Sequence, residues 1–323
     1  MSVRIGFVGA GGIANAHLRN LEQIPEAKLV AFADVDAARA KAAAERFQAT
    51  AYTDYHEMLD KEALDAVYVC VPPFAHYDAE ILAAKKGLAL FVEKPVAVTL
   101  AKAKEIARAI ADAGVLSAVG YHWRYYDITD RAREILSGRS IGMMMGYWLG
   151  GMPGVPWWRV MEQSGGQMVE QTTHIFDLAR YLCGEVDSVY AQYATRALQD
   201  VPNFSVSDVG TATLHFHNGA VGQMATSCML KKGGKVGLQV IAEDVMLEFF
   251  GGQLTITAAD KEQPEVIPSA INPSLREDQT FIAAVQSGDP AGIRSPYADA
   301  LKTLAVTLAC NESARSGKTI ALD

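Results

Sequence analysis

The sequence predicts an α/β protein of two domains, a doubly wound parallel sheet followed by an α+β domain. Strand-like and helix-like segments alternate from Val3 to Tyr121. Such alternation implies a parallel sheet covered by helices on both faces. From Val186 to Thr257 strand-like segments follow one another without helices between them, and Asn218-Gly219 is a strong hairpin signal. The second domain is therefore expected to contain a mostly antiparallel sheet.

A domain boundary is expected close behind Tyr121. The chain has 323 residues, which is long for a single hydrophobic core. We predict a first domain of residues 1–121 and a second of residues 122–323. Two helices within residues 274–316 are expected to close the chain as part of the second domain.

Composition excludes several classes of protein. Half of the residues are hydrophobic and a fifth are charged, as in a globular enzyme. The formal net charge of −8 gives no basic footprint for nucleic acid or for an anionic membrane surface. We therefore expect neither nucleic acid nor membrane as a partner.

The termini and the cysteines indicate a cytoplasmic location. The first strand-like run begins at Val3, which leaves no room for a signal peptide, and no apolar run has the length of a membrane span. The four cysteines are far apart, and each lies in an apolar stretch. That spacing favours buried thiols over a disulfide or zinc framework.

A glycine-rich turn joins the first strand-like run to the first helix-like run. Gly9 to Ala14 has the pattern Gly-x-Gly-x-x-Ala. Glycines there permit a tight turn and close approach of the backbone to a pyrophosphate at the positive end of the helix. Asp34 ends the next apolar run, at the spacing where such folds place a carboxylate on the adenosine ribose. Because a carboxylate repels a 2′-phosphate, the expected cofactor is NAD, with NADP disfavoured.

Glu93-Lys94-Pro95 follows a later buried strand, Leu88 to Val92. A lysine in that place projects at the carboxyl edge of the sheet, where open α/β sheets bind ligands. Pro95 fixes its own φ and restricts the residue before it, which indicates a constrained loop. The first half thus predicts a dinucleotide site with a cation beside it.

The second half contains an acid–imidazole pair and a group of aromatic residues. Glu170 and His174 are four residues apart on a helix predicted from Gly166 to Leu182, so they share one face. A carboxylate beside an imidazole can fix its tautomer, as a general base requires. Trp157 and Trp158 lie in a loop rich in Gly and Pro. Flat aromatic faces suit a polyhydroxylated ring.

Through these motifs the chain resembles the family of glucose–fructose oxidoreductase, inositol 2-dehydrogenase and MocA. The resemblance runs through Gly9 to Ala14, Asp34, Val71 to His76, Glu93 to Pro95 and Gly165 to Gly184, and it covers essentially the whole length. It implies a Rossmann-type nucleotide-binding domain followed by an α+β domain built on a large open sheet. The mechanism of the family that the chain resembles requires no metal, so no metal ion is expected.

The resemblance also implies roles for individual residues. The catalytic set is Lys94, His174 as proton acceptor, and Glu170, which stands where Asp is commoner in the family. The residues expected to contact the cofactor are Gly9, Gly11, Gly12, Ile13, Asp34, Val71, Pro72, His76, Glu93 and Lys94. Those expected to contact the substrate are Lys94, His122, Arg124, Trp157, Trp158 and His174.

Three functions remain open at this stage. The first is an NAD-dependent dehydrogenase that oxidises a secondary hydroxyl of a sugar, sugar derivative or cyclitol. The second is a redox-neutral glycoside hydrolase that uses NAD transiently. The third is a non-catalytic regulator that senses a dinucleotide, which the presence of Lys94, Glu170 and His174 argues against.

A homodimer or homotetramer is also expected. The second sheet should be covered by a helix on one face only. Its other face is expected to carry alternating apolar residues, such as those in Val236 to Val240. An apolar face of that size needs a partner, and a second copy of the chain supplies one.

Overall fold

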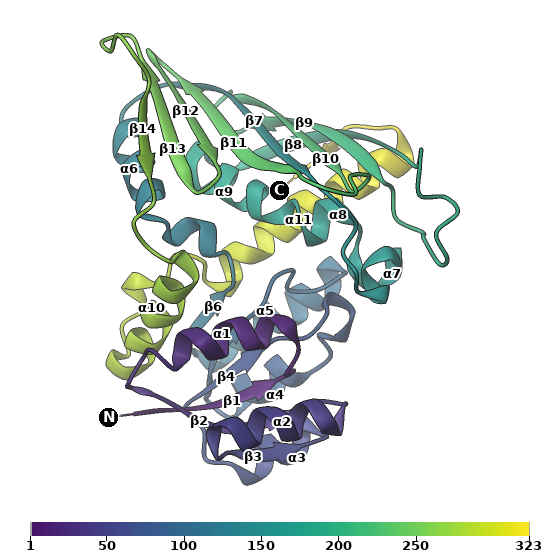
Figure 1. The fold of residues 1–323 in the computed structure, drawn as a ribbon, viewed down its shortest axis with the longest axis vertical. Helices are drawn as coiled ribbons and strands as arrows, with labels where there is room; N and C mark the ends of the chain where they lie inside the picture. Colours follow the sequence, from purple (N-terminus) through teal and green to yellow (C-terminus); the bar gives the residue numbers. More distant parts are fainter. Residues whose placement is uncertain (1, 323) are drawn as a thin grey trace. The chain divides into compact units, whose positions relative to one another are not determined.

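The computed structural model describes residues 2–322, which form two compact units. The first unit comprises residues 2–125 and 272–301, and the second comprises residues 126–271 and 302–322. This division differs from the sequence-predicted boundary, because helix α10 (Pro273–Ser287) belongs to the first unit. The physical reason is that α10 packs against helix α1 (Gly12–Leu21), so the two lie side by side although they are far apart in sequence (Figure 1).

The first unit contains the predicted parallel sheet. Its six strands are ordered β3-β2-β1-β4-β5-β6, and every neighbouring pair is parallel. The strands are β1 (Val3–Val8), β2 (Ala27–Ala33), β3 (Thr50–Tyr52), β4 (Ala66–Val69), β5 (Ala89–Val92) and β6 (Ser117–Val119). The strand order reverses between β1 and β4, and the carboxyl ends at such a switch point form the ligand-binding crevice of doubly wound sheets.

The helices of the first unit begin and end where the sequence supplies caps. Besides α1 and α10 they are α2 (Ala37–Phe47), α3 (Tyr55–Lys61), α4 (Ala79–Lys85) and α5 (Leu100–Ala113). The Thr99 hydroxyl accepts the Lys102 amide at the start of α5, and Gly114 ends that helix with a φ of 64°. Short 3₁₀ turns η1 (Pro73–Ala75), η2 (His122–Tyr125) and η4 (Pro290–Gly292) connect these elements.

The second unit contains a nine-stranded open sheet, ordered β14-β13-β12-β11-β7-β10-β9-β8-β15. Among the described strands of this second sheet only the β10–β7 pair is parallel, so the prediction of a mostly antiparallel sheet is confirmed. The strands are β7 (Ile141–Leu149), β8 (Val186–Ala194), β9 (Val209–Phe216), β10 (Val221–Ser227), β11 (Lys235–Ala242), β12 (Val245–Phe250), β13 (Gln253–Ala258), β14 (Glu265–Pro268) and β15 (Ile320–Ala321).

The helix predicted from Gly166 to Leu182 is broken in two. Helix α8 (Gln167–Glu170) and helix α9 (Thr173–Cys183) are separated at Thr172. There the Thr172 amide donates to the carbonyl of Gln167, five residues back, at 2.9 Å, and its hydroxyl bonds the Thr226 hydroxyl at 3.0 Å. The other helices of this unit are α6 (Asp127–Leu136), α7 (Met161–Ser164), η3 (Pro156–Arg159) and the part of α11 (Tyr297–Ser316) that follows Leu301.

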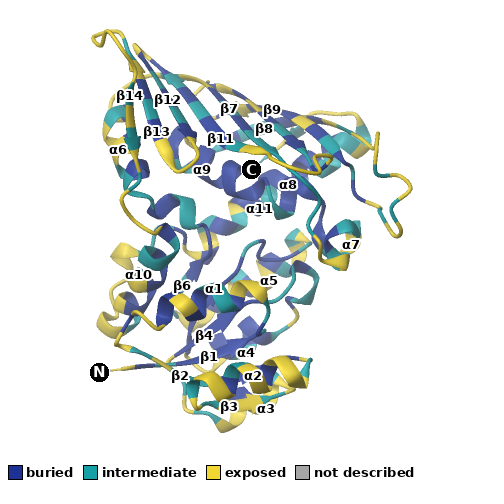
Figure 2. Ribbon diagram, in the orientation of Figure 1, coloured by how far each residue is buried: buried dark blue, intermediate teal, exposed yellow. Residues whose placement is uncertain are grey.

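Helix α9 covers one face of the second sheet and is buried along almost its whole length (Figure 2). A Cβ at Gly146 of β7 would lie 2.7 Å from the Ile175 side chain, so glycine lets helix and strand approach closely. Leu238 and Val240 of β11 are fully buried, and Leu238 pairs with Gly146 on the face that α9 covers. The expectation that these residues lie on the outer face is therefore wrong.

The outer face of the second sheet carries a different apolar group. Met143 of β7 pairs with Val221 of β10 on one side and with Ile241 of β11 on the other, so the three share one face. Met143 is 40% exposed and Val221 42% exposed. The outer face thus has apolar residues exposed side by side on neighbouring strands.

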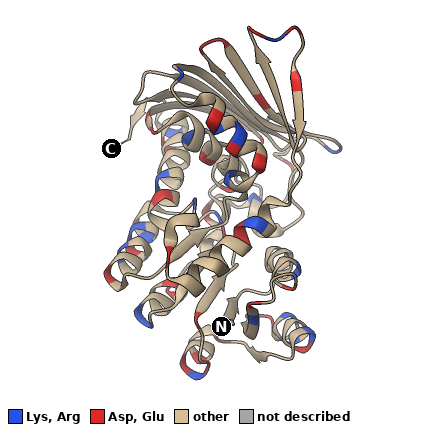
Figure 3. Ribbon diagram, turned by 90° about the vertical axis from the view of Figure 1, so that its left-hand side faces the viewer, with Lys and Arg blue, Asp and Glu red and all other residues tan. Residues whose placement is uncertain are grey.

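Surface charge gives no single-sign region in the view of Figure 3. Lys and Arg alternate there with Asp and Glu along the helices. Within residues 2–322 no helix combines the length and the apolar character that crossing a membrane requires.

A buried charged cluster lies at the centre of the first unit. His17 of α1 contacts Asp278 of α10 through Nδ1 at 2.8 Å and Glu93, just after β5, through Nε2 at 2.9 Å. Asp278 also accepts hydrogen bonds from Asn20 at 2.8 Å and from the Tyr68 hydroxyl at 3.2 Å. His17, Asp278 and Glu93 are all buried. One imidazole thus joins the dinucleotide-turn helix, the end of β5 and a helix from near the end of the chain.

The cluster holds its imidazole in the charged form. Burial alone would lower the pKa of His17, but the charge and hydrogen bond of Asp278, together with Glu93, outweigh it and raise the pKa well above the usual 6.5. The surrounding thiol and phenol stay neutral, because burial and the nearby carboxylates raise the pKa of Cys70 and of Tyr68. The imidazolium can therefore donate to both carboxylates.

His17→Gln should destabilise the protein by about 3 kcal/mol at pH 6, because it leaves two buried carboxylates without their cation. The folded-state pKa of His17 is raised, so its stabilising effect is complete below the unfolded value of 6.5 and declines as the pH rises through the folded value. Chemical denaturation of wild type and variant between pH 6 and pH 9 should show a shrinking difference. A difference that stays constant or grows with pH would contradict the charged state.

Candidate active site

The glycine-rich turn has the geometry of a pyrophosphate cradle. Gly9 has a φ of 93°, and a Cβ there would lie 2.4 Å from the carbonyl oxygen of Cys70, so only glycine fits. Added Cβ atoms at Gly11 and Gly12 would meet no protein atom within 4 Å. Ile13, in the first turn of α1, is 44% exposed for so large an apolar side chain. Open space thus lies in front of the positive end of α1, which fits a dinucleotide.

Asp34 at the end of β2 is held by its neighbours as a carboxylate acceptor. Its Oδ2 accepts the Ala10 amide at 2.8 Å, and its Oδ1 accepts Arg39 Nη2 at 2.8 Å. Burial would raise the pKa of Asp34, but the hydrogen bonds from Arg39 and from the backbone outweigh it and lower the pKa below 3.8. Arg39 remains half exposed. Arg39 follows Asp34 by five residues, and the sequence pattern did not indicate this pairing.

Lys94 lies immediately after β5 and is followed by Pro95 in a cis peptide bond. Its backbone N–H donates to Oε2 of Glu93 at 3.0 Å, while Oε1 of the same carboxylate contacts His17. A Cβ at Gly120 would lie 2.4 Å from Glu93 Oε1, so the carboxylate fits closely against the end of β6. Both carboxylate oxygens of Glu93 are thus engaged inside the first unit. Through its bond to the Lys94 amide, Glu93 can influence how Lys94 meets a ligand.

His122 and Arg124 lie in η2 of the first unit. Burial lowers the pKa of His122 to about 4; Glu93 raises it, while the charges of Lys94 and His17 lower it. His122 is therefore a neutral imidazole at physiological pH. Arg124 is buried, donates to the Arg294 carbonyl at 2.6 Å and pairs with Asp299 at 2.6 Å. These contacts hold the Arg124 guanidinium against the segment that carries Arg294 and Asp299.

The loop after β4 carries a second buried acid–imidazole pair. Val71 and Pro72 are partly buried, and His76 Nδ1 contacts Glu80 Oε1 of α4. His76 Nε2 and Glu80 Oε2 are buried, and neither has a hydrogen-bond partner among residues 2–322. Buried polar atoms normally have partners, so these two are exceptions at the loop that follows β4. Glu80 was not identified from the sequence, because an acid within an apolar helix gives no specific signal.

In the second unit, His174 lies in the first turn of α9 and is 6% exposed. The ring of Trp148 stacks on it with the centroids 6.0 Å apart. Glu170 at the end of α8 accepts a hydrogen bond from the Trp158 indole N–H at 2.7 Å. Because the helix is broken between Glu170 and His174, their relation is not that of a continuous helical face.

The two loop tryptophans differ in burial. Trp158 is fully buried in a cluster with Val206 and Cys228, whereas Trp157 is partly buried against that cluster. The burial of Trp158 argues against direct contact with a substrate, and its indole N–H instead holds Glu170. In the same loop, Arg159 Nε is buried and has no hydrogen-bond partner among the described residues.

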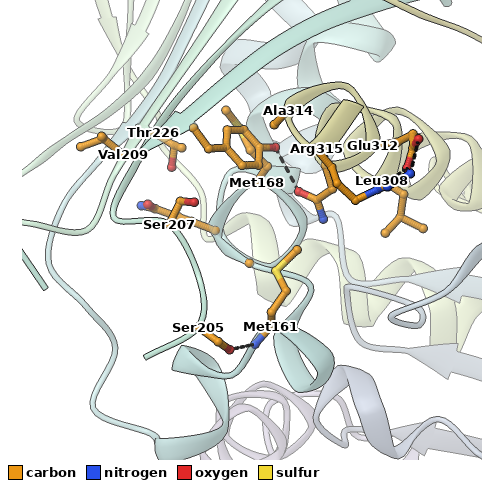
Figure 4. A pocket seen from close by; sticks show the side chains of 14 residues that line it. Met161, Met168, Ser205, Ser207, Val209, Thr226, Leu308, Glu312, Ala314 and Arg315 are labelled. Carbon is orange, nitrogen blue, oxygen red and sulfur yellow. Dashed lines mark hydrogen bonds and ion pairs between the residues drawn. The ribbon is translucent and has the colours of Figure 1, made fainter. Parts of the chain in front are cut away.

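A pocket of about 480 Å³ lies within the second unit (Figure 4). Gln167 and Met168 of α8 form part of its wall, and the end of α11 forms another part. The Tyr193 hydroxyl donates to Asn311 at 3.0 Å across it, and Glu312 pairs with Arg315 at 2.7 Å. The lining is mainly apolar, and hydroxyl and amide groups lie among its methionine and aliphatic side chains.

The sequence-predicted residues thus fall into two groups. Those in the first unit are Gly9, Gly11, Gly12, Ile13, Asp34, Val71, Pro72, His76, Glu93, Lys94, His122 and Arg124. Those in the second unit are Trp157, Trp158, Glu170 and His174. Sequence analysis did not identify His17, Arg39, Glu80 or Asp278.

Comparison with known proteins covers both halves of the chain. Residues 3–121 match the oxidoreductase family with an NAD-binding Rossmann fold, and residues 131–253 match the GFO/IDH/MocA C-terminal domain. An uncharacterised oxidoreductase, YrbE, of Bacillus subtilis (strain 168) is 30% identical over 81% of this chain and 75% of its own length. Myo-inositol 2-dehydrogenase of Thermotoga maritima is 26% identical over 99% of both chains.

A solved structure supports the same relationship. The WlbA dehydrogenase of Bordetella pertussis, in complex with NADH and UDP-GlcNAcA, has a TM-score of 0.86 and 25% identity, over 100% of this chain and 99% of that one. Matching domains, relatives and fold agree with the dinucleotide turn and the lysine at the sheet's carboxyl edge. The chain therefore belongs to the Gfo/Idh/MocA family of oxidoreductases and is a dehydrogenase of the class that acts on CH–OH groups.

Proposed function

We propose that the chain is an NAD-dependent dehydrogenase that oxidises a secondary hydroxyl of a sugar, sugar derivative or cyclitol. The observation that carries this proposal is the pairing, within one unit, of the open glycine turn at α1 with Lys94 at the end of β5. The similarity to myo-inositol 2-dehydrogenase supports the choice of substrate class. The aromatic face of Trp157 and the Nε donor of Arg159, unpartnered within residues 2–322, suit a ring with apolar faces and polar edges.

The cofactor, when bound, accepts a hydride from the carbinol carbon. His174 takes the hydroxyl proton as general base, and Trp148 limits the orientations of its ring. Lys94 donates a hydrogen bond to the same oxygen and stabilises the negative charge that develops there. Glu170, itself held by Trp158, orients His174.

The cofactor is held by the glycine turn, with Ile13, Val71, Pro72 and His76 around it. Asp34 accepts hydrogen bonds from the ribose hydroxyls and repels a 2′-phosphate, so NAD is the cofactor. Glu93 contributes by holding Lys94. His122, as a neutral imidazole, contacts the substrate, whereas Arg124 and Trp158 act on neighbouring residues.

A cytoplasmic location is supported by four cysteines that are all buried and unpaired.

The experiment that tests the function is a panel of inositols, aldoses, glucosides and sugar acids incubated with NAD and the purified protein. The proposal expects NADH to accumulate in proportion to the oxidised product. Product released from a glucoside without net NADH would indicate the redox-neutral hydrolase instead. Binding of NADH without turnover of any compound would indicate a regulator.

Gly11→Ala should weaken NADH binding about tenfold or more while changing the unfolding free energy by less than about 1 kcal/mol. The added methyl group enters the open space over the turn and meets no protein atom. Gly9→Ala is the matched control, and it should destabilise the fold by more than about 2 kcal/mol because of its φ and the Cys70 carbonyl. NADH fluorescence and thermal unfolding measure the two effects. Wild-type NADH affinity in Gly11→Ala would place the cofactor elsewhere.

Asp34→Ala should shift the ratio of NADH to NADPH affinity by about tenfold or more towards NADPH, the scale of a lost hydrogen bond to a charged group. The substitution removes the ribose acceptor and releases Arg39, whose guanidinium can then bind a 2′-phosphate. The double variant Asp34→Ala, Arg39→Ala is the control and should lose the gain for NADPH. Fluorescence titration gives both dissociation constants, and a wild-type preference for NADPH would overturn the assignment.

His174→Ala should lower kcat by at least about a hundredfold, because it loses the general base. Lys94→Met should lower kcat/KM by about a hundredfold, because it loses the cation that stabilises the developing negative charge in the transition state. Both variants should fold and bind NADH close to normally. Steady-state kinetics on the best compound of the panel provides the test. A near-normal kcat in His174→Ala would move the base to another residue, and a lowered melting temperature with normal kinetics in Lys94→Met would make that lysine structural.

The protein should be a homodimer or homotetramer that associates through the outer face of the second sheet. Val221→Lys places a charge in the apolar group with Met143 and Ile241 and should shift the protein to a smaller species. Ala42→Lys on the exposed side of α2 is the control and should leave the assembly unchanged. Light scattering at micromolar concentration measures the mass. A wild-type monomer would refute the proposal.

A further inference from the structure

One link from Lys94 to the protein interior runs through the carboxylate of Glu93. Glu93 Oε2 accepts the Lys94 amide at 3.0 Å, and Glu93 Oε1 contacts His17 Nε2 at 2.9 Å. The orientation of this carboxylate therefore affects the backbone at Lys94. The carboxylate lies close against Gly120, where a Cβ would be 2.4 Å from Oε1, so only glycine makes room for it at the end of β6.

His17 is fixed in turn from the opposite side. Its Nδ1 contacts both oxygens of Asp278, at 2.8 and 3.0 Å. Asp278 is fully buried and receives further hydrogen bonds from Asn20 and Tyr68. Contacts at hydrogen-bond distance thus run from Asp278 through His17 and Glu93 to the Lys94 amide, and these three side chains are buried.

We propose that His17 and Asp278 are positioning residues that act through Glu93 to fix the loop from which Lys94 extends. Residues 272–301 are on this view part of the active-site support of the dinucleotide unit, although they follow the second sheet in sequence. The inference rests on the proposed function of Lys94. The competing explanation is that the same contacts merely hold α10 against α1.

The charged surroundings of His17 come from several elements. Glu93 at the end of β5 and Asp278 on α10 contact it directly. Tyr68 of β4, Cys70 after it, and His122 of η2 interact electrostatically with members of the same cluster. Glu277 in turn interacts with Tyr68, and Lys94 interacts with His122. Tyr68 and Asn20 hydrogen-bond to Asp278, and the Lys94 amide hydrogen-bonds to Glu93.

The first test needs no substrate. Amide hydrogen exchange of Lys94 is measured in the full-length wild type, His17→Gln, Asp278→Asn and Tyr68→Phe. Tyr68→Phe is the matched control, because it removes one hydrogen bond to Asp278 and leaves the His17–Glu93 contact in place. We expect exchange at Lys94 to rise about tenfold or more in His17→Gln and Asp278→Asn, and less than about threefold in the control. Equal changes in all three variants would overturn the inference in favour of a purely structural role.

The second test separates positioning from stability. With NAD and the panel compound that gives the fastest NADH formation, His17→Gln should lower kcat about tenfold and leave the KM for NAD within about twofold. In a Lys94→Met background the same substitution should have no further effect on kcat, because its route of action is gone. Additive losses in the double variant would overturn the inference.

The two tests also separate failure of this inference from failure of the proposed function. If no panel compound is oxidised, or if Lys94→Met retains full kcat, the proposed function fails, and the exchange measurement alone decides whether His17 fixes the loop. If turnover and the Lys94→Met effect are as expected but exchange at Lys94 is unchanged in His17→Gln, the function stands and the positioning role is refuted.

Discussion

The structure of the first unit depends on one buried cation held between two carboxylates. Burying three ionisable groups carries a desolvation cost that exceeds what a surface ion pair contributes to stability. Each buried group therefore needs a hydrogen-bond partner at close distance. His17, Glu93 and Asp278 meet this requirement, since each is in hydrogen-bond contact with another member. The cluster therefore constrains where α1, the end of β5 and α10 lie relative to one another inside this unit. The dinucleotide turn and Lys94 extend from two of those three elements.

Glycines at close approaches make the same geometry possible. Gly9 lets the turn pass the Cys70 carbonyl, and Gly120 lets β6 end against the Glu93 carboxylate. In the second unit Gly146 lets α9, which carries His174, lie directly on β7. These positions share one physical feature: a single added methyl group would displace an element that carries a functional side chain. By contrast, Gly11 and Gly12 face open space, so the packing of the fold does not require glycine at these two positions.

Local pattern predicted much of this molecule, and long-range contacts account for what it missed. Alternating strands and helices, the Gly9 turn and the Asn218-Gly219 hairpin depend on neighbouring residues, so the sheets they predicted are confirmed. The contact between His17 and Asp278 spans 261 positions, and no local signal assigns α10 to the first unit. Likewise, the break at Thr172 depends on a bond to Thr226 on another strand, so helical periodicity alone predicted one continuous helix. The predicted site residues were found by motif, whereas Arg39 and Glu80 were missed because pairing requires coordinates.

The charge state of His17 tests the central claim most directly. Nitrogen NMR of protein labelled with ¹⁵N-histidine distinguishes a doubly protonated imidazole from either neutral tautomer, and His17→Gln assigns the signal. We predict that both ring nitrogens of His17 carry protons at pH 7.5 and remain protonated when NADH is added, since both carboxylate partners belong to the protein itself. A neutral imidazole at that pH would contradict the account, because one of the two carboxylates would then lack the donor that fixes it.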